Sequence, residues 1–597
     1  MRSSLMCLVT LMLFGCASAP PTTDRIDRYD LLIRNGMVYD GSGADPRHVD
    51  IAVHGDRIVA LLPGGTDVRA TQVIDAKGKA VAPGFINMLS WATESLIADG
   101  RGMSDTKQGV TLEVFGEGWS MGPYNETMKA ELRKQQGDIK YPVKWSTLGE
   151  YLEYLVKRGI TPNVASFVGA TTVRIHELGE GDVKPTAEQL IHMQDNVRQS
   201  MREGALGVGA SIIYPPATFA DTHELTALAQ AAAEFGGGYI AHMRSEANRF
   251  LQALDENIAI GRATGQRVES YHLKAAGEKN WPKMAQAVAK IDDARAAGVK
   301  ASANMYTYTA GATGLTAGLP PWVQAGGVDT MLARLKDPAI RKRLVAEMED
   351  PNAAWENIRL LAGSDDRVLL VDFKSEKLKP LIGKTLAQVA KMRGTSPEET
   401  SIDLIVEDQG RVGAAYFLMS EDNVELGLKQ SWMSLGSDAE SSAPEGVFLK
   451  SSTHPRAYGN FARFLGHYVR ERKLMSLQEA IHRLTGLPAH NWKLTNRGCL
   501  EVGCHADIVV FDPDTISDRS TYDKPMQYAI GVRDVFVNGV QVLRDGKHTG
   551  AAPGQVVRGP GWIGTKGESR ANIFPNGAMS VGVFTPHTLG VSMTREF

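Results

Sequence analysis

Four polar side chains stand where apolar runs of this sequence stop, and together they could do hydrolytic chemistry. Glu117 comes directly after one such run and is framed by two glycines, His242 and His272 each close a run, and Asp438 follows a fourth. In an α/β barrel the chemistry sits at the C-terminal tips of the strands, so we expect these four groups to meet in space. One glutamate, two histidines and one aspartate at four strand ends indicate a metal-dependent hydrolase.

Each of these residues could instead have a purely structural role. A histidine at a strand end is often only a hydrogen-bonded structural residue, and Glu117 and Asp438 could each cap a helix. His242 and His272 differ from an isolated histidine because both close strands in successive strand–helix units, 30 residues apart.

The elements that must position these side chains are apolar strands that alternate with helical stretches. Parallel strands need crossover connections, which place helices on the outside of the sheet. Eight such strands close a barrel, and we predict them at residues 84–88, 110–115, 163–168, 206–211, 239–242, 268–272, 301–306 and 432–436. The predicted fold class is therefore α/β, with a TIM-like (β/α)8 barrel over residues 83–495. A charged helical segment at about 320–422 predicts an insertion before the last strand that caps the barrel mouth.

Both ends of the chain show short strands separated by turns. Residues 28–82 and 496–559 are therefore predicted to share one small β-sandwich domain. Residues 560–597 are rich in Gly, Ser and Thr, and we treat them as a tail without an assigned element.

The first residues indicate export. A basic start precedes an apolar run, residues 5–14, that is too short to span a bilayer as a helix and fits a secretory signal. The run ends Leu-Phe-Gly-Cys, which resembles a bacterial lipobox with Cys16 as the lipidated first residue. We predict a lipoprotein signal peptide at 1–16, a tether at 17–27, and a periplasmic or cell-envelope protein anchored through Cys16. Plain signal-peptidase cleavage after Ala17 or Ala19 is the alternative, and it also exports the protein.

The composition is that of an ordinary globular protein. With a formal net charge of −3 over 597 residues, nothing favours nucleic acid or an anionic membrane surface as a partner. We expect a small-molecule substrate and membrane contact only through the lipid anchor; the oligomeric state is not predicted. Cys499 and Cys504 could pair in an oxidising compartment or stay free.

Several runs of the sequence resemble the amidohydrolase superfamily, and within it the D-aminoacylase (N-acyl-D-amino-acid deacylase) branch. Residues 82–86 resemble the entry to the superfamily's barrel. Runs that resemble the D-aminoacylase branch lie at residues 204–216, 241–246, 306–311, 436–438 and 454–459. Each run is weak alone, but the combination is specific and covers about residues 30–559.

The chain departs from this family directly after the barrel entry. The family usually carries His-x-His there, which holds the first of two metals, but Leu89 and Trp91 replace both imidazoles. The ligand that the two metals share, a cysteine in typical D-aminoacylases, is matched by Glu117. Leucine cannot coordinate a metal and the indole N–H only donates, so we expect one Zn²⁺ per chain.

The resemblance implies that Glu117, His242 and His272 bind this metal. Catalytic zinc takes three protein ligands of this type and keeps a position for a water, whose pKa falls to about 7. Asp438 would accept a proton as the zinc-bound hydroxide attacks an amide carbonyl, and would then pass that proton to the leaving amine.

The resemblance also implies which residues bind the substrate. In the family, the residues that match Lys274, Tyr306 and Arg456 touch it, and an arginine offers two parallel hydrogen bonds to a carboxylate. Arg456 could instead be a solvated loop charge. Tyr214 is expected to shape the pocket.

The sequence therefore predicts an exported zinc-dependent amidohydrolase that cleaves the amide bond of N-acyl amino acids, of D configuration by the resemblance, or of small D-amino-acid-containing peptides. A cyclic-amide hydrolase of the hydantoinase or dihydroorotase type is one alternative, disfavoured because no strand-end lysine stands out as a carbamylated bridge. A catalytically inactive binding relative is the other, disfavoured because Glu117, His242, His272 and Asp438 are all retained.

Overall fold

A computed structural model describes residues 28–564 of the chain. The predicted signal peptide, the tether, Cys16 and residues 565–597 of the tail lie outside the described residues. Within residues 28–564, we find no helix that is both long and apolar enough to span a membrane.

The centre of the molecule is a barrel of parallel strands. In residues 28–564 its eight positions are filled by β7 (Phe85–Asn87), β8 (Val110–Phe115), β9 (Asn163–Ser166) with its continuation β10 (Val168–Gly169), β11 (Gly207–Ser211), β12 (Gly238–His242), β13 (Val268–Ser270), β14 (Ala301–Met305) and β18 (Met433–Leu435). Every adjacent pair is parallel. The ring closes where the Met88 N–H donates to the Leu435 carbonyl at 3.1 Å. The predicted fold class is confirmed.

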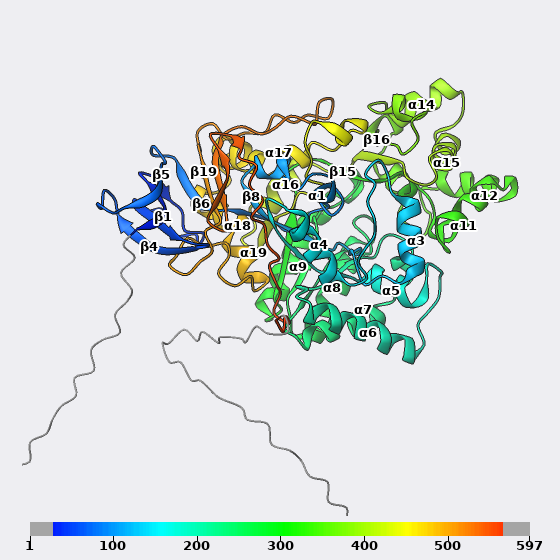
Figure 1. The fold of residues 1–597 in the computed structure, drawn as a ribbon. Helices are drawn as coiled ribbons and strands as arrows, with labels where there is room; N and C mark the ends of the chain where they lie inside the picture. Colours follow the sequence, from blue (N-terminus) through cyan, green and yellow to red (C-terminus); the bar gives the residue numbers. More distant parts are fainter. Residues whose placement is uncertain (1–27, 565–597) are drawn as a thin grey trace, which may run out of the picture.

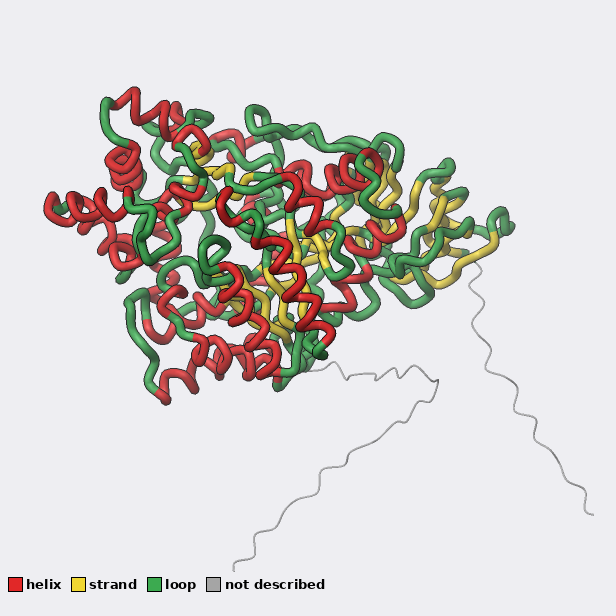
Figure 2. Tube along the Cα trace, turned by 180° about the vertical axis from the view of Figure 1, so that it is seen from behind, coloured by secondary structure: helices red, strands yellow, loops and turns green. Residues whose placement is uncertain are grey.

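Helices surround the strands (Figure 2). They are α1 (Ser95–Ala98), α2 (Met103–Thr106), α3 (Glu126–Gln135), α4 (Leu148–Arg158), α5 (Ala170–Leu178), α6 (Ala187–Arg202), α7 (Thr222–Ala233), α8 (Phe250–Thr264), α9 (Lys283–Ala296), α16 (Glu421–Leu428), α17 (Arg456–Arg463), α18 (Leu477–Leu484) and α19 (Gly486–Asn491). In α4, a capping box of Thr147 and Glu150 starts the helix, and Leu148, Tyr151 and Leu155 fall on one buried face. The helices thereby bury the outer face of the barrel.

An insertion separates β14 from β18. It contains β15 (Ala310–Gly314), α10 (Pro321–Gln324), α11 (Val328–Lys336), α12 (Pro338–Glu349), α13 (Ile358–Leu361), β16 (Val368–Asp372), α14 (Leu386–Arg393), α15 (Pro397–Glu407) and β17 (Gly413–Phe417). Its three strands form an antiparallel sheet in the order β15-β17-β16, over an apolar core of their own. The sheet begins at Ala310, ahead of the predicted start of the insertion. The insertion lies on the side opposite the N-terminal sheet (Figure 1).

The two chain ends build one small β domain. One sheet has the order β4-β3-β1-β5, from β1 (Tyr29–Arg34), β3 (Val49–His54), β4 (Arg57–Pro63) and β5 (Ala70–Asp75). The other has the order β2-β6-β19-β20-β21-β22, from β2 (Met37–Val38), β6 (Ala80–Pro83), β19 (Ile508–Phe511), β20 (Val532–Val537), β21 (Val540–Arg544) and β22 (Lys547–His548). Strand β6 pairs directly with β19, which joins the two ends.

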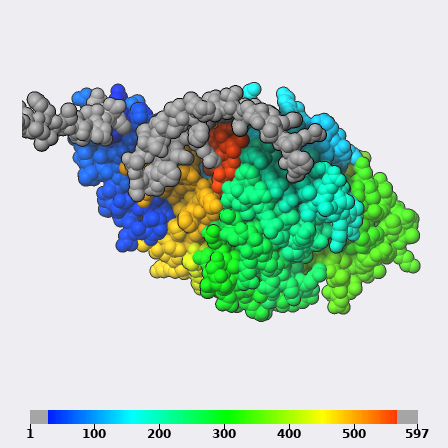
Figure 3. All heavy atoms as spheres, turned by 90° about the horizontal axis from the view of Figure 1, so that it is seen from below, coloured from blue at the N-terminus to red at the C-terminus, as the bar shows by residue number. Residues whose placement is uncertain are grey.

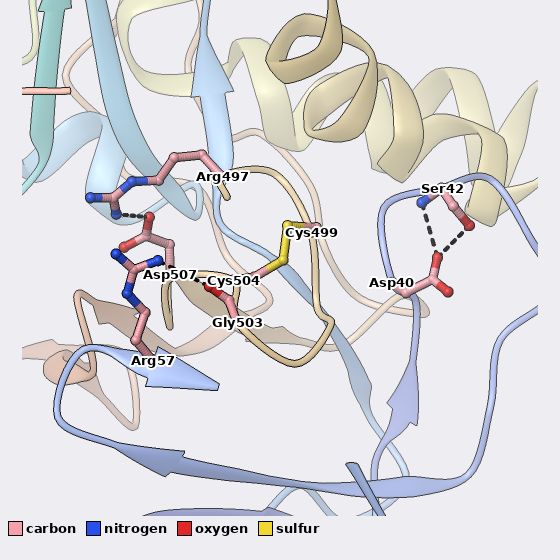
Figure 4. Close-up of a disulfide and its surroundings, with 8 residues drawn as sticks. All are labelled: Asp40, Ser42, Arg57, Arg497, Cys499, Gly503, Cys504 and Asp507. Atoms are coloured by element: carbon pink, nitrogen blue, oxygen red, sulfur yellow. Dashed lines mark hydrogen bonds and ion pairs between the residues drawn. A yellow bond between two sulfur atoms is a disulfide. The ribbon is translucent and has the colours of Figure 1, made fainter. Parts of the chain in front are cut away.

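A disulfide closes the loop that leads into β19. Cys499 and Cys504 are bonded, and next to them the Gly503 carbonyl accepts a hydrogen bond from Arg57 at 2.9 Å (Figure 4). This contact ties the loop to the β3–β4 hairpin. The last described residues run along the barrel (red in Figure 3), where the Val557 N–H donates to Val164 at 2.8 Å and Gly559 to Gly204 at 2.8 Å.

Candidate active site

Three buried donor atoms converge at the C-terminal tips of the barrel strands. Glu117 follows β8, His242 is the last residue of β12, and His272 follows β13. Glu117 Oε1 lies 3.0 Å from His242 Nδ1 and 2.8 Å from His272 Nε2, and the two ring nitrogens are 3.0 Å apart. Among the described residues this is the one group of three or more His, Cys, Asp and Glu side chains close enough to hold a metal ion. The structure therefore brings the three predicted ligands together.

The backbone at this site takes conformations that most residues avoid. Gly116 and Gly118 have φ of 110° and 73°, and a Cβ on Gly118 would sit 2.4 Å from the Cβ of Ser211. The two glycines that frame Glu117 in the sequence thus have a steric cause. His272 and Asp438 themselves have φ of 34° and 54°. Such strain in non-glycine residues clusters at functional sites, where the surroundings hold it.

The carboxylate of Glu246 supports the cluster from behind. Its Oε1 lies 2.7 Å from Lys274 Nζ and 3.0 Å from His272 Nδ1. Lys274 Nζ also lies 2.7 Å from His272 Nδ1. With a proton on Nδ1, the ring would donate to Glu246 and leave Nε2 to coordinate a metal. Sequence reasoning missed this role because Glu246 lies in the loop beyond β12; the only signal was its place in the family-like run 241–246.

The charges of the cluster fit a cation. Burial raises the pKa of Glu117, but His272 and His242 outweigh it and bring this pKa well below its ordinary value. Burial and Lys274 lower the pKa of His272, yet Glu246 and Glu117 outweigh them and raise it to about 9. In the absence of a metal ion, Glu246 and Glu117 therefore keep the His272 ring protonated at neutral pH. Two imidazoles and a carboxylate, all buried, are the donor set of a divalent metal site of the zinc type.

Asp438 lies beside the cluster with both oxygens held. Oδ2 pairs with Arg456 Nη1 at 2.9 Å, and Oδ1 accepts from the Trp91 indole N–H at 3.2 Å. Burial raises the pKa of Asp438, and Arg456 reverses only part of this rise. A carboxylate with a raised pKa in a cavity suits a group that must accept and release a proton.

Arg456 is buried and held by its neighbours. Its backbone N–H donates to His454 Nδ1 at 3.0 Å, and His454 Nε2 lies 2.9 Å from the Ala310 carbonyl. The guanidinium carbon stands 4.5 Å from the ring centre of Tyr306. Its Nε is buried without a hydrogen-bond partner in the described part of the chain. The predicted alternative of a solvated loop charge is thus wrong, because the side chain is 3% exposed.

All eight predicted site residues line one cavity of about 640 Å³. They are Glu117, Tyr214, His242, His272, Lys274, Tyr306, Asp438 and Arg456. Tyr214 stands edge-on to His242, with ring centres 5.1 Å apart. The insertion supplies one wall through residues such as Gly311, Val371 and Tyr416. Trp119, 39% exposed, also lines the cavity.

A (β/α)8 barrel that gathers these donors and a carboxylate at its strand tips defines a metal-dependent hydrolase. The chain belongs to the amidohydrolase family, whose model matches residues 72–543. It is 31% identical to a D-aminoacylase of Alcaligenes xylosoxydans xylosoxydans, over 89% of this chain and 97% of that protein. It is 30% identical to an N-acyl-D-glutamate deacylase of the same organism, over 89% of this chain and 97% of that protein.

Solved structures agree with these relatives. The N-acyl-D-glutamate deacylase of Bordetella bronchiseptica, solved with zinc and a phosphonate that mimics the tetrahedral intermediate, matches with a TM-score of 0.73. It is 30% identical, and the match covers 89% of this chain and all of that one. The resemblance seen in the sequence is confirmed: the chain is a D-aminoacylase-like amidohydrolase, an enzyme for amide C–N bonds.

Proposed function

We propose that this enzyme hydrolyses the amide bond of N-acyl D-amino acids or of small D-amino-acid-containing peptides, with one zinc ion per chain. The observation that carries the proposal is the convergence of Glu117 Oε1, His242 Nδ1 and His272 Nε2, at 2.8–3.0 Å, in the cavity that also holds Asp438 and Arg456. The D preference is supported by relatives named D-aminoacylase and N-acyl-D-glutamate deacylase.

Glu117, His242 and His272 would hold the zinc, and Glu246 would orient His272 toward it. When bound there, the metal supplies Lewis acidity, which polarises an amide carbonyl and lowers the pKa of a water. Asp438 is the proton carrier of the site: its carboxylate takes a proton from the attacking water and returns it to the nitrogen that leaves. Arg456 and Trp91 fix the orientation in which Asp438 does this.

Arg456 and Lys274 are the cations available for the free carboxylate of the substrate. Lys274 is already paired with Glu246 at 2.7 Å, and Arg456 with Asp438 at 2.9 Å. The partnerless Nε of Arg456 leaves a buried donor for an incoming anion. Arg456 is therefore the principal carboxylate anchor, with Tyr306 beneath its guanidinium.

The ligands available at the site support one metal ion rather than two. Leu89 and Trp91 replace the imidazoles that hold another metal in the family, and Leu89 is packed into an apolar cluster with Met88, Val114 and Phe167. Among the described residues, the three donors of the cluster suffice for one tetrahedral ion with a water.

We also propose that the enzyme is exported and held at the cell envelope through Cys16. The basic start, short apolar run and lipobox-like Leu-Phe-Gly-Cys support this. The bonded pair Cys499–Cys504 suits an oxidising compartment.

Paired panels of N-acetyl D- and L-amino acids test the function, with amine release followed for the purified enzyme and its metal content measured in the same sample. We expect release from D substrates, one equivalent of zinc, loss of activity on chelation and recovery with zinc. Asp438→Asn, purified identically, controls for contaminating hydrolases. Metal-free, inactive protein would favour an inactive binding relative, and faster release from L substrates would overturn the D assignment.

A further inference from the structure

The indole of Trp91 lies between the two carboxylates that the reaction needs. Its N–H donates to Glu117 Oε2 at 2.9 Å and to Asp438 Oδ1 at 3.2 Å. Both acceptors belong to functional groups of the site, and they come from segments that lie far apart in the sequence. No other side chain in residues 28–564 donates a hydrogen bond to both of them.

The backbone fixes Trp91 in this place. The Asp438 N–H donates to the Leu89 carbonyl at 2.8 Å, and the Trp91 N–H of the main chain donates to Ala439 at 2.9 Å. Ser90 and Ala439 form a parallel β-bridge. The segments that carry Trp91 and Asp438 are therefore held side by side as a short extension of the barrel wall, and the indole reaches Asp438 without crossing the cavity.

A donor at this point has two effects. It engages Glu117 Oε2, so that the other oxygen, Oε1, faces His242 and His272. It also engages Asp438 Oδ1 while Arg456 holds Oδ2. A donor shared by two neighbouring carboxylates also offsets the repulsion between them, because a hydrogen bond to the ionised form of a carboxyl favours that form.

We propose that Trp91 is a positioning residue, whose neutral indole N–H holds Glu117 as a ligand through one oxygen and holds Asp438 in the orientation that its role as proton carrier needs. The inference rests on the proposed ligand and base roles of these two residues. It assigns Trp91 a task that goes beyond filling the space left by an absent imidazole. Because the indole donates and cannot coordinate, it joins the two carboxylates without a metal between them.

Trp91→Phe tests the proposal, because it keeps an aromatic ring and removes only the N–H and part of the ring system. We expect zinc affinity, measured by competition with a chromophoric chelator, to fall on the order of 10- to 100-fold, as for other groups that orient a metal ligand. We also expect the acidic limb of the kcat profile, measured at saturating zinc, to move up by about one pH unit, because the ionised Asp438 loses a donor. KM should change less than kcat.

Trp119→Phe is the matched control, because Trp119 lines the same cavity and makes no hydrogen bond through its indole with any described residue. It should leave the zinc affinity and the acidic limb unchanged. Trp91→Gln provides a second arm: its side-chain amide N–H can donate to the two carboxylates and, unlike a histidine, does not add a usual zinc ligand, so it should restore part of the affinity lost in Trp91→Phe.

Wild-type zinc affinity and an unmoved limb in Trp91→Phe would overturn the proposal, as would equal shifts in Trp119→Phe. No rescue by Trp91→Gln would also overturn it, because it would assign the loss to packing. A wild-type enzyme without zinc or amidase activity is a different result, and it would overturn the proposed function instead.

Discussion

Replacing Glu246 with glutamine keeps the shape of the side chain but removes the charge that Lys274 and His272 both face. Glu246 Oε1 lies 2.7 Å from Lys274 Nζ and 3.0 Å from His272 Nδ1, and all three side chains are buried. The glutamine retains one acceptor oxygen, so the change tests charge and tautomer control more than packing.

We expect Glu246→Gln to lower both the stability of the fold and the affinity for zinc. Breaking a buried ion pair costs about 3–5 kcal/mol, since it leaves an unpaired charge. Lys274 can limit this cost by giving up its proton, which from an ordinary pKa of about 10.4 costs about 4–5 kcal/mol at pH 7, so the two estimates agree. Glutamine also supplies no full carboxylate to the Nδ1–H of His272, so zinc affinity should fall about 10- to 100-fold.

Competition with a chelator measures the zinc affinity, and thermal unfolding of the metal-free protein measures the stability separately. Glu440→Gln is the control, because Glu440 lines the same cavity and makes no hydrogen bond or ion pair with the described residues. Adding Lys274→Met to Glu246→Gln removes the orphaned charge, and we expect the double variant to unfold at a higher temperature than Glu246→Gln alone. Unchanged zinc affinity in Glu246→Gln, or a double variant less stable than the single one, would refute this account.

Four further predictions follow from the same cavity and from the N-terminus. Asp438→Asn should lower kcat by at least ~100-fold with zinc retained; loss of zinc would make Asp438 a ligand, and a near-normal rate would remove it from the mechanism. Arg456→Ala should raise KM for free-acid substrates more than for their amides, and should move the acidic limb of kcat to higher pH because Asp438 loses its cation; equal effects on acids and amides would assign Arg456 a structural role. Zinc affinity should rise with pH up to about 9, the pKa of His272 in the metal-free site, because the proton on the ring competes with the metal below that pH; titration calorimetry would contradict this if affinity levelled off near the ordinary histidine pKa of about 6.5. Cys16→Ser should leave the exported protein unanchored or unprocessed in membrane fractionation, and a full-length mature variant still bound to the membrane would rule out Cys16 as the anchor.

The barrel could be predicted from the sequence because its strands are short segments, most of them rich in apolar residues, and are buried on both faces. Val110–Phe115, for example, is buried at every position. Strand ends were then enough to locate Glu117, His242 and His272, since parallel strands deliver their C-terminal tips to one edge. The sheet of the insertion was not predicted, because its three strands pair only with one another and their partners lie far apart in sequence.

The supporting groups of the site were harder to predict. Glu246 lies in a loop, where no periodicity marks the direction of a side chain, and its role depends on Lys274 and His272 from the next strand. In the sequence, Trp91 was interpreted only as the replacement of a metal-binding imidazole. Its hydrogen bonds to Glu117 and Asp438 depend on the closure of the barrel between β7 and β18, which brings distant segments together.

The pairing of β6 with β19 makes the small β domain depend on a complete chain. During synthesis β6 appears early. Its partner β19 appears only after the whole barrel and its insertion. Pairings this distant in sequence form slowly, because a long loop must close first. Until then β6 exposes an unpaired edge, which is a template for association with other chains. A product truncated before Ile508 keeps that edge permanently, so we expect it to aggregate even when every metal ligand and Asp438 are present.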